Sequence, residues 1–136
     1  NYLMPLIRYK IGDLAIKSSK MSSCKCGRNL PIIDKIIGRD TDLLYTPKYK
    51  ILVVHFFTGI LEHFPEIKQF QVKQIKKGGE IQIRYIEGIN FSKNILEKIK
   101  NKIYERAEED FPLHFSNVEK IKPSPSGKPQ IILRAY

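Results

Sequence analysis

The chain has 136 residues, 42% hydrophobic and 28% charged, which is typical of a globular domain with its own core rather than a disordered segment. The formal net charge of +10 favours anionic partners such as nucleotides or nucleic acid, although scattered lysines also serve as an ordinary solvated surface. The sequence shows no secretory signal and no apolar run of the roughly 20 residues that a membrane-spanning helix needs. We therefore expect a soluble, cytoplasmic protein.

Apolar periodicity divides the chain into short predicted strands and two longer predicted helices. Alternating or continuous apolar runs predict strands at residues 2–10, 14–17, 32–37, 43–46, 51–54, 69–75, 80–86, 115–121 and 130–133. Helical spacing predicts helices at residues 55–64 and 92–110, with Ser92 as the N-cap of the second helix. The sequence Lys76-Lys77-Gly78-Gly79 supplies the glycines of a hairpin turn between two of these strands.

The order of elements predicts both the fold class and the domain organisation. From residue 43 to 136 the order is ββαββαβ, which favours an α+β fold with a small mixed or antiparallel sheet covered by two helices. Residues 1–37 are β-rich and leave no helix to cover their apolar strands, so we interpret them as a remnant of a preceding N-terminal domain. Between the two regions lies the sequence GRDTD at residues 38–42. We predict a hinge there, with Thr41 and Asp42 as hinge residues; an ordinary charged turn is the alternative.

The cysteines indicate half of a metal site. Cys24 and Cys26 are too close in sequence for an ordinary disulfide, but a Cys-x-Cys pair can supply two thiolates. Zinc takes four ligands in structural sites, and the chain has no further cysteine. His55, His63 and His114 are poor candidates, because they lie on an apolar-faced helix or beside a core phenylalanine. Two interpretations stay open: a Zn²⁺ site completed by ligands from an upstream segment, and a pair of reduced thiols without metal.

Four stretches, in this order and at these separations, resemble the C-terminal third of adenylate-forming acid ligases. They are MPLIRYKIGDL at residues 4–14, CKCGRNLP at 24–31, GRDTD at 38–42 and SGK at 126–128. The branch they resemble most is that of phenylacetate–coenzyme A ligase and the related bacterial capsular-polysaccharide biosynthesis (CapK-like) proteins. Each motif is weak alone, and the series is specific.

The resemblance implies roles for particular residues in binding ATP with Mg²⁺ and in activating a carboxylic acid. Lys128 matches the catalytic lysine, which neutralises charge developing at the α-phosphate of ATP. Asp13 and Arg39 match the residues that hold the nucleotide ribose. The ordinary alternatives are a solvent lysine in a Pro/Gly loop, a turn aspartate, and a salt bridge of Arg39 to Asp40 or Asp42.

Two positions depart from the family pattern. Thr41 occupies the hinge position where the family often has Asp or Lys. The turn Pro47-Lys48-Tyr49-Lys50 also lacks the glycine that the family commonly has near the pantetheine arm of coenzyme A. We expect a tyrosine at this point to narrow the passage of that arm. Tyr49 therefore counts against thioester formation with coenzyme A and leaves adenylation unaffected.

The resemblance also implies partners. The phosphate-gripping loop and the acyl pocket would belong to an N-terminal adenylation domain of the same protein, so we expect this chain alone to be inactive. The acid substrate is not encoded in these residues. An alternative partner for the apolar strands of residues 1–37 is a second copy of the chain, which would give a homodimer.

The rival hypothesis is a non-enzymatic, basic α+β module that binds nucleic acid. Such modules place aromatic side chains on an exposed sheet face, interleaved with Arg or Lys. In this sequence the aromatic residues fall mostly at helical core positions, and Gln82 and Arg84 flank no aromatic ladder. The sequence therefore favours the ligase.

Overall fold

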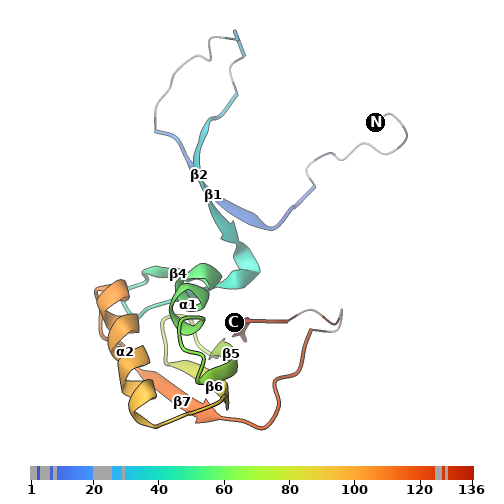
Figure 1. Ribbon diagram of the computed structural model, residues 1–136. Coiled ribbons are helices and arrows are strands. Elements are labelled where there is room, and N and C mark those ends of the chain that lie inside the picture. The colour runs from blue at the N-terminus through green and yellow to red at the C-terminus, as the bar shows by residue number, and fades with distance from the viewer. Residues whose placement is uncertain are drawn as a thin grey trace. The chain divides into compact units, whose positions relative to one another are not determined.

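The structure is a computed structural model that describes residues 3, 7, 9–19, 26–28, 30–124, 127 and 129–136 (Figure 1). Contacts divide the chain into two compact units, Asn1–Asp40 and Thr41–Tyr136, which we describe separately. The boundary lies within the predicted hinge at residues 38–42. The predicted strand at residues 2–10 falls mostly outside the described residues. Within the described part of the chain, neither helix is both long enough and apolar enough to cross a bilayer.

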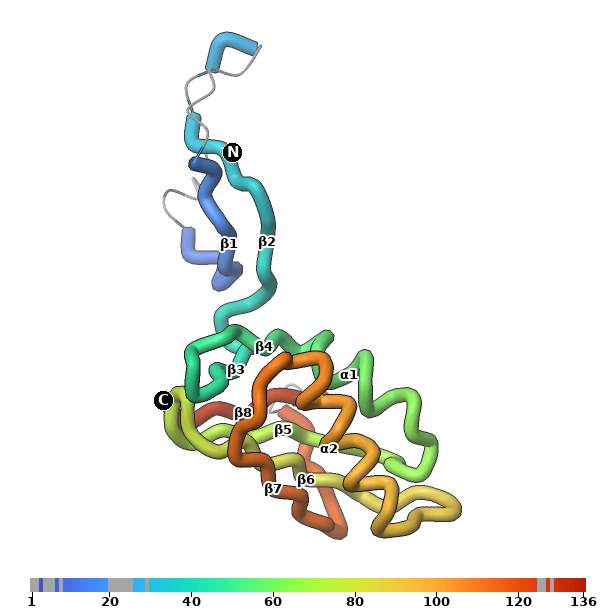
Figure 2. Tube along the Cα trace, turned by 90° about the vertical axis from the view of Figure 1, so that its left-hand side faces the viewer, coloured from blue at the N-terminus to red at the C-terminus, as the bar shows by residue number. Residues whose placement is uncertain are grey.

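The first unit is a two-stranded antiparallel ribbon formed by β1 (Asp13–Lys17) and β2 (Ile33–Arg39). The two strands run side by side in Figure 2. Ile16, Ile33 and Ile36 are 48%, 59% and 68% exposed, and none of the described residues before Thr41 is buried. A lone ribbon without a core is marginally stable in water. Among the described residues of this unit, none covers these apolar side chains.

The second unit contains every other element. The 3-10 turn η1 (Asp40–Asp42) leads into the antiparallel hairpin of β3 (Leu43–Tyr45) and β4 (Ile51–Val53). The remaining elements are α1 (Val54–Leu61), β5 (Ile67–Gln74), β6 (Ile81–Glu87), α2 (Asn94–Ala107), β7 (Leu113–Asn117) and β8 (Ile132–Arg134). The sheet order is β7-β6-β5-β8, with β5 and β6 antiparallel and both outer pairs parallel. This confirms the predicted α+β class with a mixed sheet and two helices, although the order from β3 on is ββαββαββ, one strand more than the predicted ββαββαβ.

The two faces of this sheet differ in character. The register places Val72, Ile83 and Ile132 on one face, and these residues join the apolar sides of both helices in the core. The other face carries Gln71 and Arg84, which are directly opposite each other across β5 and β6. Because side chains alternate along a strand, one face packs under the helices and the other is left polar.

Two predicted boundaries are wrong in detail. The second helix begins at Asn94, with Lys93 at the N-cap position and no side-chain cap hydrogen bond, so Ser92 is not its N-cap. The strand predicted at 115–121 is Leu113–Asn117, because it pairs with β6 from Leu113 onward. Tertiary pairing, rather than local propensity, determines where such short strands begin and end.

The buried amide of Gln74 joins three parts of the second unit. Its Oε1 accepts hydrogen bonds from the Tyr45 backbone N–H (3.2 Å) and the Tyr136 hydroxyl (2.7 Å). Its Nε2 donates to the carbonyls of Tyr45 (2.7 Å) and Gly79 (2.9 Å). Gln74 has no exposed surface, and burial raises the pKa of the Tyr136 hydroxyl, which favours its protonated, donating form. One side chain therefore fastens the β3–β4 hairpin, the β5–β6 turn and the C-terminus together.

Replacing Gln74 should destabilise the second unit as a whole. Gln74→Met keeps the volume but leaves the Tyr45 backbone and the Gly79 carbonyl without partners, and each unsatisfied buried group costs about 1–3 kcal/mol. We expect a loss of roughly 3 kcal/mol in the free energy of unfolding, measured by urea denaturation. Gln69→Met is the matched control, since Gln69 is an exposed glutamine of the same strand and should change stability by less than about 0.5 kcal/mol. Equal, small effects of both substitutions would contradict this role.

Candidate functional site

The two residues predicted to hold a ribose lie opposite each other in the first unit. Asp13 is the first residue of β1 and Arg39 the last of β2, and the antiparallel register pairs them directly. Beyond this pair, the Asp40 backbone N–H donates to the Gly12 carbonyl at 2.8 Å, with Gly12 at φ +82°. Residues directly opposite on an antiparallel pair have their side chains on the same face. The ribbon therefore presents a carboxylate and a guanidinium together at its end.

Both side chains are exposed, and among the described residues neither Asp13 nor Arg39 takes part in a salt bridge. The alternative of Arg39 paired with Asp40 or Asp42 is therefore not what this structure shows. An exposed carboxylate is an acceptor only, and an exposed guanidinium donates only. Together they match the two kinds of partner that the hydroxyl groups of a ribose can use.

The predicted hinge residues lie in η1, directly before the core of the second unit. The Thr41 hydroxyl donates to Asp42 Oδ1 at 3.0 Å, and Thr41 is exposed. Leu43 and Leu44 follow at once and have no exposed surface. The change from exposed to buried backbone thus takes place over a single short turn. Hinge motion itself stays a prediction.

The turn without the expected glycine adopts a backbone that glycine favours. Tyr49 has φ +62°, in the left-handed region that non-glycine residues rarely occupy. The Tyr49 N–H donates to the Thr46 carbonyl at 2.8 Å, and the Thr46 hydroxyl accepts from the Lys50 N–H at 3.1 Å. These bonds hold the turn closed around buried Thr46. The turn conformation therefore suits a glycine, although the residue is a 64% exposed tyrosine.

The same turn is fastened to the C-terminal end of α2. Lys50 Nζ donates to the Ala107 carbonyl (2.6 Å) and forms a salt bridge with Glu108 (3.1 Å). The Lys48 backbone N–H donates to Glu109 Oε1 at 3.2 Å. A cation at a helix C-terminus binds the last carbonyls and the negative end of the helix dipole. The sequence does not predict this role of Lys50, because its partners are far away along the chain.

Aromatic rings and cations surround this turn. Lys77 Nζ lies 4.1 Å from the centroid of the Tyr45 ring and 6.0 Å from that of Tyr49. The Tyr45 and Tyr136 rings are 6.4 Å apart, and the Arg134 guanidinium lies 5.6 Å from the Tyr136 ring. Cation–π contacts of this kind contribute about 0.5–1 kcal/mol each at exposed sites. The hairpin surface is therefore lined by tyrosine rings that are paired with cations.

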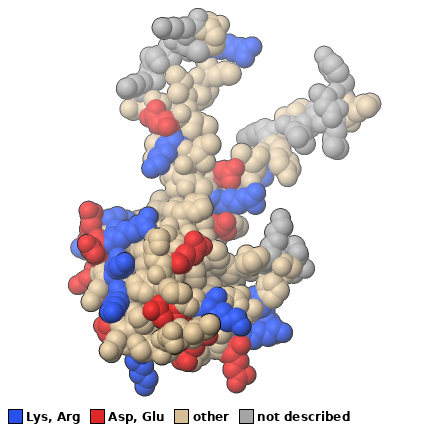
Figure 3. Space-filling view, viewed as in Figure 1, with Lys and Arg blue, Asp and Glu red and all other residues tan. Residues whose placement is uncertain are grey.

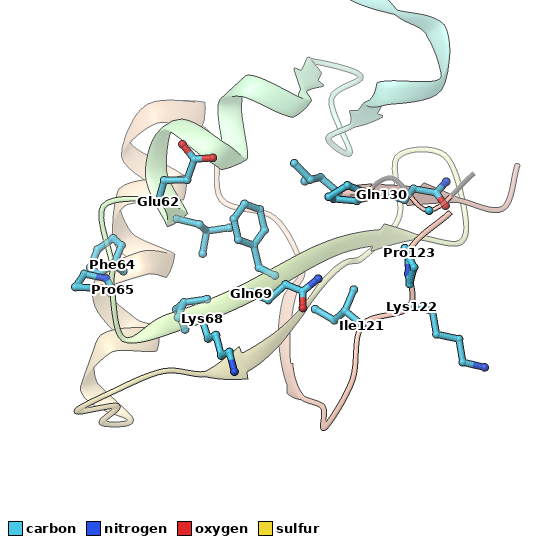
Figure 4. Close-up of a pocket in the computed structure, with 15 residues that line it drawn as sticks. Glu62, Phe64, Pro65, Lys68, Gln69, Ile121, Lys122, Pro123 and Gln130 are labelled. Atoms are coloured by element: carbon cyan, nitrogen blue, oxygen red, sulfur yellow. The ribbon is translucent and has the colours of Figure 1, made fainter. Parts of the chain in front are cut away.

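The predicted catalytic residue Lys128 lies outside the described residues. Its neighbours Gly127 and Pro129 are described, and both line an open cavity of about 620 Å³ (Figure 4). The cavity lies between the end of α1, the start of β5 and the segment around Ile121. Its other walls are mostly apolar, including Phe64 and Phe70. Gly127 and Pro129 themselves are exposed, at the open side of this cavity.

The structure adds little to the metal hypothesis. Cys26 is exposed, and Cys24 lies outside the described residues. Over the ranges that the structure does describe, no group of three or more His, Cys, Asp or Glu side chains is placed to hold a metal ion. Two thiols are fewer than the four ligands of structural zinc. A Zn²⁺ site at these cysteines would therefore need ligands from elsewhere.

No protein-family model matches the sequence, and no curated protein sequence matches it. Solved structures do match. With 2-hydroxyisobutyryl-CoA ligase in the postadenylation state the chain has a TM-score of 0.56 at 12% identity, covering 89% of this chain and 27% of the ligase. The shared feature is the fold. An open conformation of the same ligase, in complex with 2-HIB-AMP and CoA, gives 0.50 at 15% identity, covering 89% and 27%.

A domain of phenylacetate-coenzyme A ligase from Bacteroides vulgatus gives a TM-score of 0.41 at 15% identity, covering 69% of this chain and 94% of that domain. The chain spans about a quarter of the length of 2-hydroxyisobutyryl-CoA ligase, at 27% coverage. The matched structures thus include adenylate-forming acyl-CoA ligases, as the sequence motifs led us to expect.

Glycine should be the preferred residue at position 49. Tyr49→Gly relieves a left-handed backbone that costs an L-residue about 1–2 kcal/mol, whereas Tyr49→Ala keeps that cost. We expect the glycine variant to unfold with a free energy about 1 kcal/mol higher than that of the alanine variant. Lys48 supplies the control. Its φ is not positive, so Lys48→Ala should be more stable than Lys48→Gly. If the alanine variant were more stable than the glycine variant at both positions, the left-handed backbone at Tyr49 would be refuted.

Proposed function

We propose that this chain is the C-terminal part of an ATP-dependent, adenylate-forming acid–CoA ligase. In this proposal residues 43–136 form the mobile domain, residues 38–42 the hinge and residues 1–37 a strip of the preceding adenylation domain. The observation that carries the proposal is the cross-strand pairing of Asp13 with Arg39 at the predicted hinge. Fold similarity to 2-hydroxyisobutyryl-CoA ligase supports it independently.

Each proposed residue has one chemical task. Asp13 accepts hydrogen bonds from ribose hydroxyls, and Arg39 donates to the ribose from the facing strand. Lys128 places an ammonium where negative charge develops, as the carboxylate attacks the α-phosphate of ATP and pyrophosphate leaves. Magnesium, when bound with ATP, neutralises phosphate charge. Thr41 and Asp42 would carry the rotation between the adenylation and thioester-forming states.

The thioester step is the second half of the proposal. Matched structures of 2-hydroxyisobutyryl-CoA ligase are complexes with 2-HIB-AMP and CoA, and we infer that coenzyme A is the acyl acceptor here too. The turn that would approach the pantetheine arm keeps the backbone of a glycine turn at Tyr49. The CxCGR and RYxxGDL motifs favour the phenylacetate–coenzyme A ligase or CapK-like branch. The acid itself is left unspecified, since its pocket would lie in the adenylation domain.

The exposed apolar side chains of the β1–β2 ribbon favour a large partner that covers them. Ile33 and Ile36 are more than half exposed, and we propose that the N-terminal adenylation domain of the same protein covers them. A homodimer through the same ribbon is the alternative. The proposal also includes a cytoplasmic location, a Zn²⁺ site completed at Cys24 and Cys26 by upstream ligands, and an inactive isolated chain.

The nucleic-acid alternative gains no support. On the view of the second unit in Figure 3, Lys and Arg lie interspersed with Asp and Glu rather than forming one basic stripe. The open face of the central strands carries Gln71, Lys73 and Arg84 and no aromatic side chain from β5 or β6. Single-stranded nucleic acid needs stacking platforms on such a face.

Acid-dependent exchange of pyrophosphate into ATP by the full-length protein tests the proposal. Lys128→Ala should lower the exchange rate by a factor on the order of 100 or more, because removing charge stabilisation at the reacting phosphoryl group costs roughly 3 kcal/mol. ATP binding, measured separately, should be nearly unchanged. Lys98→Ala is the matched control, since Lys98 is an exposed lysine of α2. Near-normal exchange by the Lys128 variant would overturn the proposal.

A further inference from the structure

The polar face of the sheet holds a second cavity of about 420 Å³, which adjoins the first and shares Lys122, Pro123 and Gln130 with it. Seven residues line it: Gln71, Arg84, Lys120, Lys122, Pro123, Gln130 and Leu133. They come from β5, β6, β8 and the segment that crosses this face after β7. Their sequence pattern predicts no role for any of them, and none contributes to the proposed ligase chemistry.

Gln71 gives the cavity a fixed floor. Gln71 is 2% exposed, and its Oε1 accepts a hydrogen bond from Arg84 Nη1 at 2.9 Å. Its Nε2 donates to the Gln130 carbonyl at 2.9 Å, so the amide is satisfied at both ends. A buried amide held this way cannot rotate without losing both bonds. It therefore fixes the guanidinium of Arg84, which has five N–H donors, at the cavity wall.

The charge of the cavity lining is unbalanced. Arg84, Lys120 and Lys122 contribute three cations, and the lining contains no acidic side chain. Within the described part of the chain none of these cations forms a salt bridge. Lys122 also lines the neighbouring apolar cavity, and its side chain extends outward in Figure 4. Cations gathered without a counter-charge repel one another, and a bound anion relieves this repulsion.

We propose that this cavity is an anion site that takes a phosphate group. A phosphate group carries about two negative charges at neutral pH and offers several acceptor oxygens. It can thus use the Arg84 fork and both ammonium groups at once, whereas a carboxylate has one charge and two oxygens. The proposal does not rest on the ligase assignment, because it uses neither Asp13, Arg39 nor Lys128.

Titration of the 136-residue chain with inorganic phosphate, followed by amide NMR, tests the site. Ionic strength is held constant with sodium chloride, and sodium acetate serves as a second anion. Phosphate should shift the amides of Gln71, Arg84 and Gln130 in a saturable way, and chloride and acetate should not. Methyl phosphate separates the two sources of the ligand. Saturation by both compounds identifies a phosphate-monoester site, and saturation by phosphate alone identifies a free-ion site.

Matched double variants make the test specific. Lys120→Gln/Lys122→Gln removes two exposed cavity lysines and should weaken phosphate binding at least about 10-fold. Lys93→Gln/Lys98→Gln makes the same charge change on exposed residues of the second helix and its N-cap, and should leave the affinity within about twofold. The proposal fails if phosphate causes no saturable shift, if chloride or acetate reproduces the shift, or if both double variants weaken binding equally. An oligonucleotide that shifts amides across the whole polar face, with phosphate inert, would overturn it in favour of nucleic-acid binding.

Discussion

The buried amide of Gln74 is the interaction on which the second unit depends. The β3–β4 hairpin has only three residues per strand, and an isolated hairpin of this length is marginally stable in water. Gln74 compensates by bonding both backbone groups of Tyr45, the turn after β5 and the hydroxyl of Tyr136. The β3–β4 hairpin is thereby attached to β5, a central strand of the sheet. Lys50 provides the second attachment, at the end of α2.

The turn at Tyr49 belongs to this attached hairpin and joins its two strands. Its left-handed backbone is held by Thr46 and Lys50 rather than by glycine flexibility. A turn conformation that favours glycine is thus kept although the residue is a tyrosine. Strain of this kind persists only where surrounding contacts determine the backbone.

The sheet of the second unit uses its two faces for different purposes. Alternation along β5 sends Val72 under the helices and Gln71 to the opposite side, so one strand serves both the core and a polar cavity. Both helices cover the same face, which leaves the other to a single crossing segment anchored by Ile121. The buried Gln71 on that face is satisfied by Arg84 and by the Gln130 carbonyl, which offsets the cost of burying its amide. Polar side chains therefore lie on one face of the sheet while the apolar core packs on the other.

The sequence by itself determined the elements that rest on local periodicity. Helical and strand spacing encode burial directly. The sequence therefore predicts the apolar stripes of α1 and α2, the glycine turn between β5 and β6, and the change in residue pattern at 38–42. The motifs likewise indicated acid-ligase chemistry. What local patterns cannot encode is which distant residues meet.

Only the tertiary structure decided that Asp13 faces Arg39, because strand register is set by pairing across the ribbon and not by either strand alone. It also decided that Lys50 caps α2 and that Gln74 holds Tyr136. Each of these contacts joins segments separated by many residues, and each partner looks like an ordinary surface or strand residue in the sequence. Their roles exist only once the fold has brought a specific donor to a specific acceptor.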